Sequence, residues 1–291
     1  MNNYKKIKEE NLVLIQNPEK LFDINFLIPV RNRIEFAQPM YNSFLKAKEN
    51  SSLAISYTVI EHSEIPDHAK FCKKNKINYI WIKSAPDELF NKCLCYNLGA
   101  LYSNISKYIL FHDIDCLVQS DFFVKLTKNI TNQNCKAIQC FQQRRVLYCN
   151  ENLTKEIVNE KFTAFDVLNL KDNSNIDLPR LGGKVMLGAP GGSILVEREL
   201  FFDVGGYDDD LFLANSPEDA YFWEKIDTIS KMHTAENPAI DIFHMYHSPT
   251  YMSNPYIKQM QKIYEDFKKL TKEEKTREIK EKSKQIKKFL I

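Results

Sequence analysis

The chain has few glycines, little net charge and no long hydrophobic run. Only 8 of its 291 residues are glycine, whereas 44% are hydrophobic and 12% are aromatic, so the composition predicts a globular protein rather than a disordered one. Its formal net charge of +2 gives no reason to expect a polyanionic partner, and we expect no binding of nucleic acid. A chain of this length can bury a substantial core in one large domain or two.

Segments that would direct the chain to a membrane or out of the cell are also missing. No run approaches the roughly 20 apolar residues that span a bilayer, and the start, MNNYKKIKEENLVLIQ, lacks the apolar region of a secretory signal. The 7 cysteines, an odd number, indicate free thiols in a reducing compartment. Cys93 and Cys95 form a C-x-C pair without a second pair at zinc-site spacing. We therefore expect a soluble, cytoplasmic protein.

The strongest chemical signal is an Asp-x-Asp sequence at residues 111–116, FHDIDC. The apolar run YIL before it predicts a buried strand that ends where open α/β sheets bind their ligands. Asp113 and Asp115 point to the same side of an extended chain, so both can address one cation and the diphosphate or ribose that it accompanies. Taken alone, the pair also fits a solvated turn.

The first part of the chain alternates strand and helix patterns. Strands at 24–30, 56–61 and 78–83 are separated by helical patterns, an order that predicts a parallel sheet in a nucleotide-binding arrangement. The first strand leaves through Pro29 into a turn with Arg31 and Arg33 and then a helix. Two guanidinium groups beside a helix N-terminus suit an anionic ligand, although both arginines would also fit a plain surface.

Three further side chains are candidates for donor contacts in this half. Glu61, at the end of the second strand, can reach a base or ribose, or it is an ordinary exposed residue. A helix predicted over about 86–106 has one apolar face and carries Lys92 and Asn97. Both can point toward the Asp-x-Asp edge, while a solvated lysine is the alternative.

A second dense stretch runs from 187 to 226. The pair Gly191-Gly192 allows close approach of the backbone to a ligand and precedes an apolar strand. Farther on, Pro217-Glu218-Asp219 starts a predicted helix. Proline and acids in a first turn are also good capping chemistry, so Glu218 and Asp219 have a purely structural alternative.

The last third adds two histidines and a basic tail. His244 and His247 follow a strand pattern, and a pair of imidazoles near an Asp-x-Asp sequence favours a divalent metal site. Residues 258–291 hold 12 basic and 6 acidic residues around a thin apolar stripe. We expect a helical tail that packs on the body, with contact to a membrane surface or a partner protein as the alternative.

Six motifs, in this order, resemble those of the beta-1,4-galactosyltransferase family (glycosyltransferase family 7), with a looser likeness to bacterial chondroitin-type polymerase domains. They span about residues 24–250 and read FLIPVRNR, NKCLCYNLGA, FHDIDC, APGGSILVERELFFDVGGYDDD, SPED and HMYHSP. The resemblance implies an α/β protein with the GT-A fold, a mainly parallel nucleotide-binding sheet flanked by helices. It also implies an inverting transfer of a sugar from a UDP-sugar donor to a hydroxyl of a glycan or glycolipid acceptor, with Mn²⁺ or Mg²⁺.

The resemblance also implies a role for each matching residue. The uridine diphosphate pocket would be lined by Pro29, Arg31 and Arg33. Asp113 would face the ribose or the metal shell, and the metal ligands would be Asp115, His244 and His247. Asp219 would be the general base and Glu218 would hold the acceptor sugar, with Gly191 and Gly192 beside donor and acceptor.

Two departures from the family pattern affect specificity. The family's tryptophan- and glycine-containing lid is replaced here by LFLANSP, so the lid's movement and its part in acceptor choice are not expected from the resemblance. Ala189 stands where galactose-transferring members have a bulky aromatic residue, which leaves room for an N-acetyl group and favours a UDP-N-acetylhexosamine donor. The animal members' membrane anchor is missing, so we expect a cytoplasmic enzyme, at most peripheral to a membrane.

The domain expectation is a GT-A domain over 1–257, with a donor half at about 24–120 and an acceptor half at about 121–257, followed by the tail at 258–291. Two other functions remain open. A sugar-nucleotide pyrophosphorylase would use a similar sheet but normally has a glycine-rich loop near the first strand, where this chain reads PVRNR. A non-catalytic module that binds a nucleotide sugar would keep the fold without the turnover.

Overall fold

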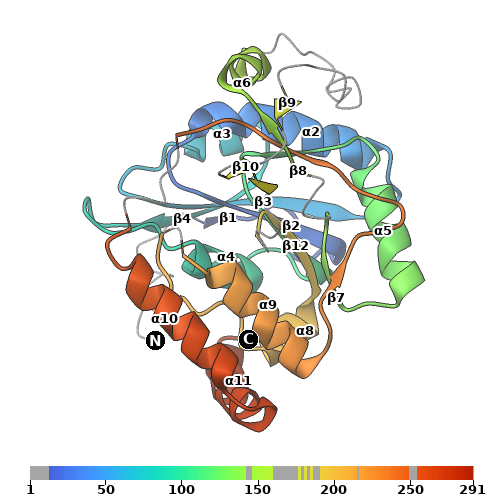
Figure 1. Cartoon of the computed structure of the whole chain (residues 1–291). Coiled ribbons are helices and arrows are strands. Elements are labelled where there is room, and N and C mark those ends of the chain that lie inside the picture. The colour runs from blue at the N-terminus through green and yellow to red at the C-terminus, as the bar shows by residue number, and fades with distance from the viewer. Residues whose placement is uncertain are drawn as a thin grey trace.

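The computed structural model describes residues 13–141, 146–159, 191–214, 216–248 and 254–290, together with three two-residue strands between 176 and 185. A central sheet separates two groups of helices (Figure 1). Helices α2 and α3 lie on one face, and α4, α8 and α9 lie on the other with the tail helices α10 and α11. This arrangement is the expected α/β architecture.

The large sheet has eight strands in the order β1-β4-β3-β2-β5-β12-β7-β13. In that order they are Val13–Leu14, Asn78–Lys83, Ile55–Ser63, Phe22–Val30, Ser106–His112, Ser193–Glu197, Ala137–Gln139 and His233–Thr234. The four strands β4, β3, β2 and β5 are parallel, and β12 runs antiparallel to both β5 and β7. The predicted parallel half is therefore present, and a reversed strand follows it.

Ten helical segments flank the sheets in the described part of the chain. They are η1 (Ile34–Phe36), α2 (Ala37–Glu49), α3 (Ala69–Lys74), α4 (Lys92–Tyr102), α5 (Phe122–Gln133), α6 (Glu151–Val158), α8 (Arg198–Asp203), α9 (Glu218–Ile229), α10 (Ile257–Lys269) and α11 (Lys272–Lys287). Helix α4 starts later than the pattern from residue 86 predicted, because the Asn91 side chain caps it by accepting from the Leu94 amide at 2.8 Å. This cap places Lys92 at the first helical position.

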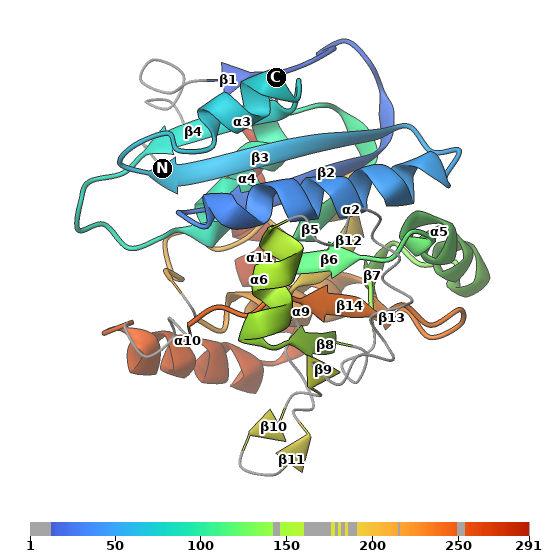
Figure 2. The same ribbon diagram turned by 90° about the horizontal axis from the view of Figure 1, so that it is seen from above.

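A smaller sheet joins distant parts of the chain (Figure 2). Its strands are β6 (Cys116–Val118), β14 (Ile242–His244), β8 (Val146–Cys149) and β9 (Ile176–Asp177), and a separate pair is formed by β10 (Arg180–Leu181) and β11 (Lys184–Val185). β14 pairs antiparallel with β6, so that His244 lies opposite Cys116. The Met245 amide then donates to the Asp115 carbonyl at 2.8 Å. The histidine segment is thereby fixed beside the Asp-x-Asp turn.

The two faces of the large sheet bury separate apolar clusters. One side contains Phe26, Phe44 and Phe123, and the other contains Phe111 and Phe222, all at most 2% exposed. All seven cysteines are buried and have free thiols. Alternating strands and amphipathic helices thus give each face a core of its own.

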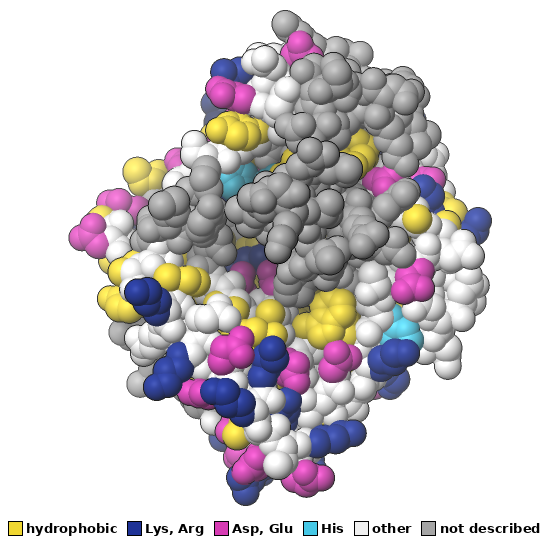
Figure 3. All heavy atoms as spheres, in the orientation of Figure 1, with side chains coloured by type: hydrophobic (Ala, Val, Ile, Leu, Met, Phe, Trp, Pro, Cys, Tyr) yellow, Lys and Arg dark blue, Asp and Glu magenta, His cyan; other side chains and the backbone are white. Residues whose placement is uncertain are grey.

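The C-terminal tail packs on the body, as the apolar stripe predicted. Its buried side chains, Met260, Phe267, Ile279 and Ile286, belong to the cluster beneath α8 and α9. A capping box at Thr271 and Glu274 starts α11 directly after α10. Basic and acidic side chains are interspersed over the outer surface of the tail region (Figure 3). Among the described residues, no helix combines the length and the apolar character needed to cross a membrane.

We expect Ile286→Ala to lower the free energy of unfolding by about 3 kcal/mol, because it would leave a cavity where α11 packs on the body. Leu290→Ala, at a side chain that is 41% exposed, is the control and should cost less than about 0.5 kcal/mol. Urea unfolding followed by circular dichroism measures both. Equal and small losses would mean that α11 contributes little to the stability of the fold.

Candidate functional site

The Asp-x-Asp turn is shaped by buried polar contacts. His112 ends β5, and its Nε2 donates to the Cys116 carbonyl while its Nδ1 accepts from the Ser193 hydroxyl at 2.8 Å. Burial lowers the pKa of His112 to about 4, so its imidazole is neutral near pH 7. The Asp113 amide donates to the Gly192 carbonyl at 3.0 Å. The turn is thus tied to β12, which places the two aspartates.

Three groups that are far apart in the sequence meet at Asp115. Ligand-capable atoms of Asp115, His244 and His247 all lie within 4.8 Å of one another. His247 Nε2 is 3.1 Å from Asp115 Oδ2, and His244 Nε2 is 3.8 Å from Oδ1. Burial opposes ionisation of Asp115, but His244, His247 and Arg33 together hold its pKa well below its usual range. The carboxylate is therefore charged and surrounded by cationic or imidazole groups.

The donor set at Asp115 suits a divalent cation. His244 Nδ1 is buried and has no hydrogen-bond partner among the described residues, although its ring stacks on Tyr148 at 4.7 Å. Arg33 donates to the Asp115 carboxylate, and its Nη2 lies 3.2 Å from His247 Nδ1. The guanidinium group therefore places a positive charge beside the three candidate ligands. One carboxylate and two imidazoles are common ligands of transition metals.

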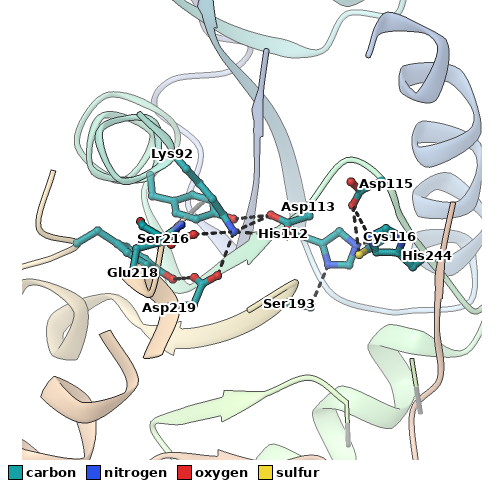
Figure 4. A network of polar contacts seen from close by, with 12 residues as sticks. Lys92, His112, Asp113, Asp115, Cys116, Ser193, Ser216, Glu218, Asp219 and His244 are labelled. Carbon is teal, nitrogen blue, oxygen red and sulfur yellow. Dashed lines mark hydrogen bonds and ion pairs between the residues drawn. The ribbon is translucent and has the colours of Figure 1, made fainter. Parts of the chain in front are cut away.

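A second charged group surrounds Lys92 (Figure 4). Its Nζ lies 3.0 Å from Asp113 Oδ1, 3.1 Å from Asp219 Oδ2 and 3.7 Å from Glu218 Oε1. Burial opposes a charged ammonium, but Asp113 and Asp219 raise the pKa of Lys92 above its ordinary value. Lys92 therefore joins the Asp-x-Asp turn to the first turn of α9.

The Asp219 carboxylate lies against the backbone of Gly191, just before β12. A Cβ added at Gly191 would lie 2.1 Å from Asp219 Oδ2, which no real side chain tolerates. The other oxygen, Oδ1, accepts a hydrogen bond from the Tyr207 hydroxyl at 3.1 Å. Any larger residue at position 191 would therefore force the Asp219 carboxylate to move.

Glu218 is buried beside a second carboxylate. Its side chain is 7% exposed and accepts from the Ser216 hydroxyl at 2.9 Å and from the Ser216 amide at 3.2 Å. Burial and the nearby Asp219 raise the pKa of Glu218 to about 7, and Lys92 acts in the opposite direction. Near neutral pH this carboxyl is present in both protonation states, so it can donate as well as accept a hydrogen bond.

Several residues that were predicted to contact the donor do not reach the Asp115 group. Arg31 points to the loop after β4, where it donates to Ser84 Oγ at 2.8 Å and to the Glu88 carbonyl. Pro29 is buried within β2, opposite Ile60. Ala189 lies outside the described residues. Of the residues at the start of the chain, Arg33 is the one that reaches the Asp115 group.

Glu61 and Asn97, also predicted to contact the donor, are both buried and bonded to backbone groups of the fold. Glu61 is 0% exposed and accepts from the amides of Asp67 and His68, both at 3.0 Å. Asn97 is 1% exposed and bonds to the backbone of Tyr207. Their polar groups hold turns in place, which composition and spacing do not reveal. The predicted donor contacts of Glu61 and Asn97 stay predictions.

Sequence reasoning missed the hydroxyl groups that contact the two aspartates. Tyr96 donates to Asp113 Oδ1 at 3.3 Å, and Tyr207 donates to Asp219 Oδ1. Both rings lie in the apolar cluster, so they fit the pattern of ordinary core residues. Only the direction of the hydroxyl distinguishes them, and no sequence signal gives that direction.

Comparison with protein families decides the class of this protein. The model of the glycosyltransferase like family 2 matches residues 49–232, more than half of the chain. The chain belongs to this family. The matched region includes the Asp-x-Asp turn, Lys92 and the Glu218-Asp219 pair, and it ends before the histidines. The resemblance to glycosyltransferases that the sequence motifs indicated is thereby confirmed.

Solved structures of glycosyltransferases have a fold similar to that of this chain. S. aureus TarS (residues 1–349) in complex with UDP-GlcNAc is 12% identical, with a TM-score of 0.54 over 91% of this chain and 72% of that one. A mutant Drosophila beta-1,4-galactosyltransferase 7, solved with manganese, UDP-Gal and xylobiose, is 15% identical, with a TM-score of 0.47 over 80% and 73%. A search of the curated proteins found no match. The TarS likeness concerns the fold, and the predicted GT-A fold is confirmed.

Glu218 gives the stability a predictable pH dependence. Its pKa is about 7 in the folded protein against 4.5 ordinarily, so between these values the folded state keeps a proton that the unfolded chain has lost. The contribution of Glu218 to the free energy of unfolding should therefore fall by up to about 3 kcal/mol as the pH rises from 4.5 to 7. The buried His112, whose pKa is lowered to about 4, contributes with the opposite sign over this range, so the contribution of Glu218 is the difference between the wild-type profile and that of Glu218→Gln.

Urea unfolding between pH 4.5 and 8 checks this, with Glu64→Gln, at an exposed position, as the matched control that keeps the wild-type slope. Parallel profiles for the wild type and Glu218→Gln would contradict the raised pKa.

Proposed function

We propose that this glycosyltransferase is metal-dependent and inverting, and that it moves a hexose or N-acetylhexosamine from a UDP-sugar to a hydroxyl of a glycan or glycolipid acceptor. One observation carries the proposal. Lys92 joins Asp113, which precedes Asp115 of the histidine group by two residues, to Asp219. A candidate cation site and a candidate base therefore lie close to one network of polar contacts (Figure 4).

The Asp115 end would bind the donor diphosphate. Asp115, His244 and His247 would hold Mn²⁺ or Mg²⁺, which when bound neutralises the negative charge of the leaving diphosphate. Arg33 adds a guanidinium group that suits phosphate oxygens. Asp113, with 30% of its side chain exposed, would face the ribose or the metal shell. Arg31 and Pro29 would lie on the uridine side of the pocket.

The Asp219 end would accept the proton. As the acceptor hydroxyl attacks the anomeric carbon, a new carbon–oxygen bond forms, the bond to the diphosphate breaks on the opposite face, and the hydroxyl proton passes to Asp219. Attack opposite the leaving group inverts the anomeric centre. Gly191 would leave space beside the base and Gly192 would lie near the donor. Glu218, which both donates and accepts near pH 7, would hold the acceptor sugar.

The identity of the sugar and the location of the enzyme remain proposals. Ala189 supports a UDP-N-acetylhexosamine through its small side chain. We propose a cytoplasmic enzyme. Because Phe267 and Ile286 use the apolar face of the tail for internal packing, contact with a membrane or partner protein would depend on exposed basic residues such as Lys280 and Lys288.

A donor screen tests the proposal. With Mn²⁺, at least one of UDP-Gal, UDP-GalNAc, UDP-GlcNAc and UDP-Glc should release UDP when acceptor sugars are added. Asp219→Asn should lower this rate about a thousandfold while UDP binding survives, because only the proton acceptor is lost. Asp266→Asn, on the exposed face of α10, is the matched control and should have wild-type activity.

Each competing function has its own result in this screen. UDP binding without release from any of the four donors would favour the non-catalytic module. Release of UTP from a UDP-sugar and pyrophosphate would favour the pyrophosphorylase. Unchanged turnover in Asp219→Asn would remove Asp219 from the role of base.

A further inference from the structure

Asp219 is held from two sides by very different groups. Lys92 contacts Oδ2, and the Tyr207 hydroxyl donates to Oδ1, both at 3.1 Å. Lys92 is shared with Asp113 and Glu218, and an ammonium on a flexible stem acts as a point charge that does not fix the plane of a carboxylate. The Tyr207 hydroxyl is therefore the contact that can set the orientation of Asp219.

Tyr207 itself is held rigidly. It is 2% exposed, and its ring stacks on Phe222 with centroids 4.1 Å apart and an angle of 17° between the rings. Its amide donates to Asn97 Oδ1 at 2.9 Å, and its carbonyl accepts from Asn97 Nδ2 at 2.8 Å. One side chain of α4 thus satisfies both backbone groups of Tyr207, which leaves the phenol ring little freedom.

The turn before Tyr207 is enclosed by two further helices. Gly205 and Gly206 have φ angles of +80° and +64°, which favour glycine. A Cβ at Gly205 would lie 2.6 Å from Lys282 Cβ, so α11 packs directly against the turn. From α9, the Lys225 ammonium donates to the Gly206 carbonyl at 2.6 Å. The tail is therefore part of the support behind Tyr207.

We propose that Tyr207 is a positioning residue for Asp219, and that Asn97 and α11 keep its hydroxyl in place. This inference rests on the proposed role of Asp219 as the base. In this role Tyr207 touches neither donor nor acceptor. It fixes the carboxylate in the orientation that receives the acceptor proton, and it prevents Lys92 from drawing the carboxylate toward Asp113.

The test is Tyr207→Phe, which removes one oxygen and keeps the ring. Using the donor that releases UDP fastest in the screen with Mn²⁺, we expect kcat to fall about tenfold, with the donor KM and the affinity for UDP unchanged. In the Asp219→Asn background the same substitution should cause no further loss, because the oriented group no longer acts as a base. A general loss of packing would instead lower the residual rate in the Asp219→Asn background as well.

Two further tyrosine variants serve as controls. Tyr221 lies on α9, as Asp219 does, but its ring packs on Phe267 of α10 with centroids 4.4 Å apart, and Tyr221→Phe should keep wild-type kcat. Tyr96→Phe removes the hydroxyl that contacts Asp113 and should raise the donor KM instead. This pair of variants separates the base side of the network from the donor side.

The outcomes distinguish the inference from the function on which it rests. Wild-type kcat in Tyr207→Phe, an equal fall in Tyr221→Phe, or a further loss in the Asp219→Asn background would overturn the positioning role while the base assignment stands. Full turnover in Asp219→Asn would overturn the base assignment itself. No UDP release from any donor would overturn both.

Discussion

The pairing of β14 with β6 is the constraint on which the candidate site depends. Its register sets His244 opposite Cys116 and ties Met245 to Asp115, so two histidines from the end of the chain reach an aspartate near the middle. The apolar side chains of this small sheet, such as Leu117 and Phe243, are buried in the core. The pairing brings His247 Nε2 to 3.1 Å and His244 Nε2 to 3.8 Å from the Asp115 carboxylate. A slip by one residue would turn His244 to the opposite face, because side chains alternate along a strand.

Charge compensation is the second requirement of the site. Asp113, Glu218 and Asp219 converge with one ammonium, and a buried carboxylate is costly unless it is paired or protonated. The raised pKa of Glu218 shows how the excess negative charge is reduced. Lys92 therefore has a structural as well as an electrostatic function, since it holds the Asp-x-Asp turn and the first turn of α9 together.

Local patterns predicted the elements of the fold and the groups that gather at the site. Apolar runs before Arg31 and Asp113 marked parallel strands, whose carboxyl ends meet at one edge for geometric reasons. The roles of buried polar residues were not predictable, because the amides that Glu61 and Asn97 contact come from turns. The hydroxyl of Tyr207 was missed for the same reason, since the direction of a core side chain depends on tertiary packing.

The most direct test of the account is calorimetric titration of UDP with and without Mn²⁺. The wild type should bind UDP tightly only with the metal, and Asp115→Ala and His247→Ala should each weaken this binding at least about tenfold, because each removes a proposed ligand. His233→Ala, at a half-buried position on β13, is the matched control and should bind as the wild type does. Wild-type affinity in both Asp115→Ala and His247→Ala would contradict the proposed metal site.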